Sequence, residues 1–155
     1  MIELSRKRAL IGIAAVLGAS AIVFTASAQK PQDPSQAPGG PTVEVSMVRQ
    51  DQSDCTNSDV NGNDPSRIGG TAWIVRQADG NTAVKVAITA SPNTVYHFFL
   101  KCVRQLGDIK TQDEGEGIAT FEFPTNTTGA VYAFDMYPEG APPGNKFQSV
   151  QVKFQ

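Results

Sequence analysis

From Val43 onward, apolar residues recur at every second position in short runs, and this pattern constrains the fold more than any other feature. Successive side chains of a β-strand point to opposite faces, so the alternation predicts half-buried strands rather than helices. The runs are rich in Val, Ile, Phe and Tyr and are bounded by turn-forming residues. With 14 Gly, 10 Pro and only 18% charged residues, the composition also disfavours helical bundles. We therefore expect an all-β protein.

The pattern predicts seven strands, at residues 43–47, 71–77, 83–89, 94–101, 118–123, 130–137 and 146–154. The Asp-Gly pair at 79–80 predicts a tight hairpin, so the second and third strands should pair antiparallel. The fourth strand is apolar on both faces except at His97, which predicts a central strand covered on both sides. Seven short antiparallel strands predict a two-sheet β-sandwich with Greek-key or immunoglobulin-like topology. The alternative is a β-barrel.

Residues 1–28 have the layout of a secretory signal peptide. A basic start (Arg6, Lys7, Arg8) precedes 18 uncharged residues and the small-residue motif Ala26-Ser27-Ala28. We predict cleavage after Ala28 and a periplasmic or secreted mature protein. The alternative is an uncleaved anchor, because 18 uncharged residues approach the roughly 20 that span a bilayer.

Two segments follow the predicted signal. Residues 29–42 contain four Pro and two Gly and no large apolar side chain, which predicts an extended linker. Residues 43–155 then form the β-domain. Without residues 1–28 the chain has a net charge of −4, and its basic residues are scattered singly. Because nucleic-acid binding needs clustered Lys and Arg, we expect no nucleic-acid partner, and membrane contact only through the export segment.

Cys55 and Cys102 are the only cysteines. An even number in an exported chain predicts one disulfide, Cys55–Cys102, which would join the polar loop 51–70 to the end of the fourth strand. A redox-active pair is disfavoured because the two residues are not in a Cys-x-x-Cys motif. One His and two Cys cannot supply a zinc centre or the metal site of a Cu/Zn superoxide dismutase, so we expect no metal and no cofactor.

Residues 90–96, Ala-Ser-Pro-Asn-Thr-Val-Tyr, resemble the tyrosine-corner stretch of immunoglobulin-like and fibronectin type III sandwiches. In those domains a Pro-x-Thr-x-Tyr run opens a central strand. The resemblance covers seven residues and implies a sandwich in which the Tyr96 hydroxyl bonds back to the backbone. It departs from the antibody pattern, because Tyr96 lies six residues before Cys102 rather than two. The resemblance implies no activity.

Three groups of polar residues are candidates for chemistry. Asp59, Asn61, Asn63 and Asp64 in loop 51–70 have the alternating oxygen spacing of a calcium loop, but Gly62 and the missing Glu depart from the EF-hand, so a solvated loop is favoured. His97 could act as a base or as a lone ligand. Because it alternates with Val95 and Phe99, we predict a buried or partly buried, hydrogen-bonded histidine.

The third group, Asp113, Glu114 and Glu116, could supply paired carboxylates for glycoside hydrolysis but is expected to be a solvated hairpin turn. We therefore assign no catalytic residue. The function that the sequence favours is a non-enzymatic binding or accessory module of the bacterial envelope or extracellular space, with a protein or polysaccharide partner. The alternatives are a secreted carboxylate-dependent hydrolase and a structural component of an envelope assembly. Joint exposure of Trp73, Tyr132 and Tyr137 would indicate a binding face.

Overall fold

The computed structural model describes residues 40–52, 55 and 60–154. The predicted signal peptide 1–28, most of the linker 29–42, and Asp54 and Asp59 of the polar loop lie outside these residues. Near the end of the linker, the Gly40 backbone N–H donates to the carbonyl oxygen of Arg76 at 3.1 Å. No helix within the described ranges is long and apolar enough to cross a membrane.

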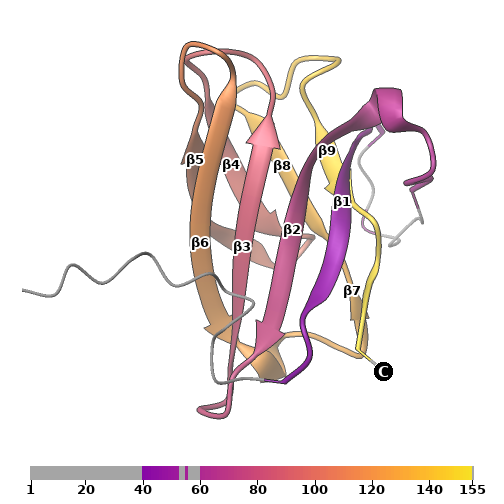
Figure 1. Cartoon of the computed structure of the whole chain (residues 1–155), viewed down its shortest axis with the longest axis vertical. Coiled ribbons are helices and arrows are strands. Elements are labelled where there is room, and N and C mark those ends of the chain that lie inside the picture. The colour runs from indigo at the N-terminus through magenta and orange to yellow at the C-terminus, as the bar shows by residue number, and fades with distance from the viewer. Residues whose placement is uncertain (1–39, 53–54, 56–59, 155) are drawn as a thin grey trace, which may run out of the picture. The chain divides into compact units, whose positions relative to one another are not determined.

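Ten strands and two single-turn 3-10 segments make up the described chain (Figure 1). They are β1 (Val43–Arg49), η2 (Pro65–Arg67), β2 (Ile68–Arg76), β3 (Asn81–Thr89), β4 (Val95–Leu100), β5 (Arg104–Lys110), β6 (Glu116–Pro124), η3 (Thr125–Thr127), β7 (Val131–Tyr132), β8 (Phe134–Pro138), β9 (Phe147–Ser149) and β10 (Val152–Lys153). Eight strands form one sheet in the order β5-β4-β8-β9-β1-β2-β3-β6, and β7 pairs with β10. All the pairs are antiparallel.

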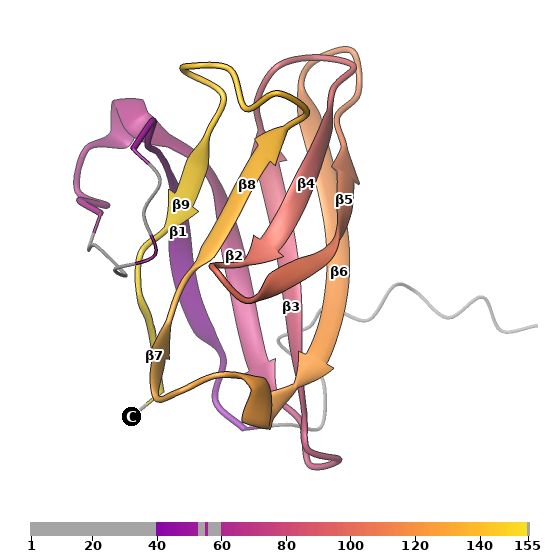
Figure 2. The same ribbon diagram turned by 180° about the vertical axis from the view of Figure 1, so that it is seen from behind.

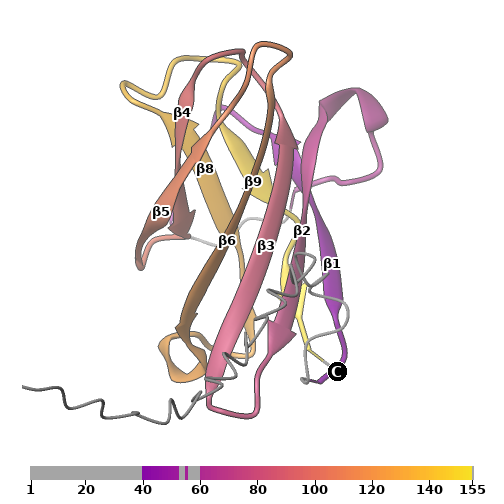
Figure 3. The same ribbon diagram turned by 60° about the vertical axis from the view of Figure 1, so that its left-hand side comes forward.

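The eight-stranded sheet curls into a nearly closed barrel (Figures 1 and 3). Its two terminal strands, β5 and β6, are consecutive in the chain and are joined by a tight turn, in which the Gln112 N–H donates to the Glu116 carbonyl at 2.8 Å. Gly107 lets the two strands approach, because a β-carbon there would lie 2.6 Å from the ring of Phe121. The barrel alternative is consistent with this structure, whereas the predicted two-sheet sandwich is not confirmed, since the second sheet of the described residues is only the two-stranded ribbon of β7 and β10.

Aromatic rings from three strands fill the interior on the side where the barrel closes. Phe98 of β4 has no exposed surface, and its ring centroid lies 5.1 Å from those of both Phe121 on β6 and Phe134 on β8. Edge-to-face contacts extend this cluster to Phe123 and Tyr132. The rest of the core consists mainly of inward side chains from β1, β2 and β3, with contributions from β4, β5, β8, β9 and β10, and burial alternates most regularly along β3.

Two differences from the predicted strands have clear local causes. The segment Arg104–Lys110 forms β5, which the sequence analysis missed because its apolar residues, Leu106 and Ile109, are three apart rather than two. The predicted strands 130–137 and 146–154 are each broken into two, at Ala133 and at 150–151. The halves serve different partners, since β8 and β9 belong to the barrel and β7 and β10 form the small ribbon.

The tyrosine-corner stretch behaves as the resemblance implies, although the surrounding fold is barrel-like. Tyr96 is completely buried, and its hydroxyl accepts a hydrogen bond from the Ser91 backbone N–H at 3.1 Å. The same hydroxyl donates to Oδ1 of Asn145 at 3.1 Å, and the Ser91 hydroxyl donates to that oxygen at 2.8 Å. These bonds hold the loop between β8 and β9 against the start of β4.

Candidate functional site

The outer face of β4 is the most distinctive surface of the barrel. Tyr96, Phe98 and Leu100 point inward and are completely buried, so the alternate residues of β4 point outward. His97 therefore lies on the exterior with 26% of its side chain exposed. It is partly buried and hydrogen-bonded, as one form of the prediction stated, but it does not lie in the core. Both faces of this strand carry apolar residues, so the period-two pattern alone could not show which face is inside.

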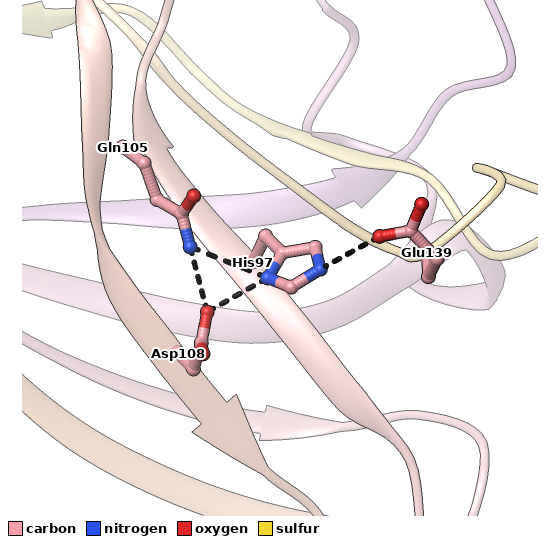
Figure 4. A network of polar contacts seen from close by, with 4 residues as sticks. All are labelled: His97, Gln105, Asp108 and Glu139. Atoms are coloured by element: carbon pink, nitrogen blue, oxygen red, sulfur yellow. Dashed lines mark hydrogen bonds and ion pairs between the residues drawn. The ribbon is translucent and has the colours of Figure 1, made fainter.

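His97 is held in a network of polar side chains on the exterior (Figure 4). Its Nδ1 lies 2.7 Å from Oδ1 of Asp108, a residue directly opposite on β5. The Gln105 amide donates to the same Asp108 oxygen at 2.7 Å. On the other side of the ring, Nε2 lies 3.5 Å from Oε2 of Glu139, which follows β8. The imidazole thus connects β5 to the loop after β8.

The carboxylates determine the protonation of this histidine. An ionised carboxylate only accepts hydrogen bonds, so Nδ1 carries a proton and donates it to Asp108. When Nε2 is also protonated, the imidazolium faces a carboxylate on each side. The hydrogen bond with Asp108 is the main cause that raises the pKa of His97 above its usual 6.5; burial opposes this effect, and the charge of Asp108 and the contact with Glu139 add to it.

The geometry of this network is that of a structural or recognition contact rather than a reaction centre. A histidine oriented by a carboxylate at Nδ1 acts as a base through Nε2, which must then face a hydroxyl or thiol nucleophile. Here Nε2 faces Glu139. The two carboxylates lie on opposite sides of the ring and do not converge, and the described residues contain no group of three or more potential metal ligands.

Beside this network, Phe99 of β4 and Tyr137 of β8 stack on the exterior with ring centroids 4.8 Å apart and planes 17° from parallel. They line a groove of about 390 Å³, together with Val103, Arg104, Gln105 and the cysteine pair. Burial raises the pKa of the Tyr137 phenol, with a further contribution from the Asp135 charge, so its hydroxyl remains a donor at neutral pH. The groove therefore offers apolar surface with hydrogen-bonding groups at its edges.

The cysteine pair lies at one end of the groove. The sulfur atoms of Cys55 and Cys102 are 2.11 Å apart, as the predicted disulfide requires, and the Cα atoms are 5.6 Å apart. Cys102 lies in the turn between β4 and β5 with a φ of 58°, the left-handed region. The disulfide fixes Cys55 of the polar loop against that turn.

The other predicted candidates do not join this site. Asp113, Glu114 and Glu116 are exposed at the turn between β5 and β6, as expected for a solvated turn. In the polar loop, Asn61 accepts a hydrogen bond from the Asn63 backbone N–H at 2.9 Å. The side-chain oxygen of Asn61 therefore stabilises a local turn.

Asp64, the last residue of the candidate calcium loop, caps the 3-10 segment η2. Its carboxylate accepts hydrogen bonds from the Ser66 hydroxyl and backbone N–H. These two bonds hold the pKa of Asp64 below its usual value, and the bond from the Ser66 hydroxyl has the larger effect. Asp59 of the same loop lies outside the described residues.

Trp73, Tyr132 and Tyr137 do not form one patch. Tyr132 is 7% exposed and points into the core, where burial raises its pKa to about 12. Trp73 lies on the outer face of β2, which two strands, β9 and β1, separate from β8 in the sheet order. Tyr137 instead has Phe99 as its partner. The exposed aromatic surface is thus divided between two sides of the barrel.

A comparison of the sequence with protein-family models and with curated proteins finds no match. The site therefore rests on its own geometry.

A titration of His97 tests the network directly, because this is the only histidine of the chain. We expect NMR to report a His97 pKa above 6.5, and Asp108→Asn to lower it. A raised folded-state pKa contributes stability that is complete below the unfolded pKa of about 6.5 and is lost as the pH rises through the folded pKa. The variant should therefore lose most of this pH dependence, while the part due to Glu139 remains. An unshifted pKa in the unmodified protein would contradict the hydrogen bond to Asp108.

Proposed function

We propose that this chain is an exported, non-enzymatic binding module that contacts a protein partner through the outer surface of β4, β5 and β8. We call this surface the β4–β8 face and define it by Val95, His97, Phe99, Val103 and Tyr137. The observation that carries the proposal is the stacked pair of Phe99 and Tyr137 beside the groove. Burying such rings against a soluble partner removes apolar area from water, which favours association.

The composition of the β4–β8 face supports a protein partner. Val95 and Val103 are 43% and 54% exposed, and Arg104 lines the groove next to Val103. Aromatic residues and Arg are enriched at the energetically dominant positions of protein interfaces, and the surrounding polar groups exclude water. The network of His97 with Asp108 and Gln105 forms a polar border of this kind and keeps its side chains in one arrangement before binding.

The alternatives receive less support from the geometry. A glycoside hydrolase needs two carboxyl groups facing each other across a substrate cleft, whereas Asp113, Glu114 and Glu116 project from an exposed turn. A structural subunit that assembles by strand pairing needs a long free sheet edge. Here β5 and β6, the two ends of the sheet order, lie next to each other.

A pair of surface variants tests the proposal. We expect the tagged mature chain to recover its partner from the envelope fraction of the producing cells. The double variant Phe99→Ser, Tyr137→Ser should weaken this recovery by about tenfold or more. Val131→Ser is the control, because Val131 is 41% exposed but lies on β7. Equal recovery by all three proteins, or an equal loss in the control, would contradict a role of the β4–β8 face.

Export is tested separately by the mass of the mature protein. The order of basic, apolar and small-residue segments predicts that the exported chain begins at Gln29. Intact-mass measurement should show the loss of residues 1–28. Retention of Met1 would instead support the membrane-anchor alternative.

A further inference from the structure

A second surface feature lies on the other side of the barrel, away from the β4–β8 face. Figure 1 looks onto β6, β3 and β2, and Figure 2 shows β8, β4 and β5 from behind. A shallow hollow of about 470 Å³ crosses the outer surface of β2, β3 and β6. Its floor is low because Gly70 and Ala87 have short or no side chains. The volume lies within the roughly 300–1,000 Å³ range of small-ligand sites.

Two apolar side chains stand at the sides of this hollow. Trp73 alternates with the buried Ala72 and Ile74, so its indole lies on the exterior of β2. Lys85 stands directly opposite on β3, with its Nζ 5.8 Å from the centre of the indole ring, a contact that favours one orientation of the ring. Ile118 of β6 is 63% exposed, the most exposed large apolar side chain of the described residues.

Hydrogen-bonding groups line the rest of the hollow. They are Thr71, Thr89, Gln112 and Glu116. Thr89 and Glu116 are opposite each other on β3 and β6. Within the described part of the chain, the side chains of these four residues form no hydrogen bond or ion pair. The Thr hydroxyls and the Gln112 amide can donate hydrogen bonds, and all four side chains can accept them. A ligand would therefore meet donors and acceptors that have no partner within the described protein.

The chemistry of the hollow discriminates among classes of ligand. A peptide strand cannot pair with the backbone of β3, which is already bonded to β2 and β6 on its two sides. An anionic ligand would meet the Glu116 carboxylate, with Asp113 and Glu114 in the adjoining turn, and the described residues that line the hollow include no Lys or Arg. A lipid chain needs continuous apolar surface, and here polar groups separate Trp73 from Ile118. A sugar ring presents one apolar C–H face and a ring of hydroxyls that both donate and accept.

We propose that this hollow is a binding site for a neutral saccharide chain, with one sugar ring against Trp73 and the hydroxyls of rings further along the chain bonded to Gln112 and Glu116. The outward residues extend the site across the sheet in rows, Ser46–Thr71–Ala87–Ile118 and Glu44–Trp73–Lys85–Thr120. Such rows provide an extended shallow surface that suits a chain better than a single sugar. This site is independent of the β4–β8 face.

Tryptophan fluorescence provides the test, since Trp73 is the only tryptophan. The probes are cellohexaose, xylohexaose, maltohexaose and chitohexaose, with oligogalacturonate as an anionic counterpart of similar length. We expect at least one neutral probe to cause a saturable change in Trp73 emission, and the anionic probe to bind more weakly. Calorimetry of Trp73→Ala with the same probe should show affinity reduced by about tenfold or more.

Further variants separate a ligand contact from a loss of folding. Glu116→Gln and Ile118→Ser, both on the exposed surface, should weaken saccharide binding while leaving the melting temperature nearly unchanged. Phe99→Ser on the β4–β8 face is the matched control and should leave saccharide binding intact. Absence of binding by all four neutral probes, tighter binding of the anionic probe, full binding by Trp73→Ala, or a homodimer that Trp73→Ala abolishes would each overturn the saccharide site. None of these results bears on the protein partner of the β4–β8 face.

Discussion

Replacing Phe98 by alanine is expected to lower the free energy of unfolding by about 3–5 kcal/mol, the usual cost of deleting a buried aromatic side chain. Phe98 is completely buried and stacks on both Phe121 and Phe134. These rings belong to β4, β6 and β8, so the cluster connects one end of the sheet to the strands near its other end. The cavity would therefore open at the place where the barrel closes.

Phe99→Ala is the matched control, because the neighbouring ring has the same size but lies on the exterior. Its contact with Tyr137 is an aromatic pair of half-buried rings on the outer face, which contributes about 0.5–1.5 kcal/mol. Urea unfolding followed by far-UV circular dichroism measures both variants. Similar losses at positions 98 and 99 would contradict the assignment of inner and outer faces to β4.

Removal of the Cys55–Cys102 bond should have an effect of comparable size. The two residues are 47 apart in the sequence, and closing a loop of that length stabilises a fold by about 4 kcal/mol on the loop-entropy model. The double variant Cys55→Ala, Cys102→Ala should unfold at correspondingly lower urea concentration. Alanine is preferable to glycine here, because Cys102 has a positive φ and glycine would relieve backbone strain at the same time.

Free-thiol labelling of the denatured, unreduced protein accompanies this comparison. We expect no reactive thiol in the exported protein. Two reactive thiols, or a double variant as stable as the unmodified chain, would show that the bond is absent or contributes little. Reduction of the unmodified protein should reproduce the stability of the double variant and serves as the control for effects of the substitutions themselves.

Much of the barrel could be predicted from local sequence patterns. The strand β3 alternates regularly between buried and partly exposed residues, β1 and β2 do so over part of their length, and the Asp-Gly turn before β3 is a local signal. The cysteine pairing followed from the number of cysteines. In contrast, Arg104–Lys110 has no regular period because Gly107 and a register shift between Phe98 and Phe99 adapt β5 to its neighbours. That strand is held by tertiary contacts rather than by its own pattern.

The missing strand also explains why the candidate site was not predicted. Asp108 and Gln105 both lie on β5, and without that strand nothing placed a carboxylate opposite His97. The outward direction of His97 was equally hidden, since Val95 and Phe99 share its face and are as apolar as the inward residues. Glu139 comes from a loop whose position depends on long-range bonds of Asn145 to Tyr96 and Ser91. Such contacts are not encoded in local periodicity.

The central claim, that the β4–β8 face binds a partner, is tested most directly by photo-crosslinking in the producing cells. A photoreactive amino acid is placed at position 99, at position 103, or at position 131 as an exposed control outside the face. We predict one discrete crosslinked product from positions 99 and 103 and none from position 131. Equal crosslinking from all three positions, or none from 99 and 103 in protein that is exported and folded, would contradict the claim.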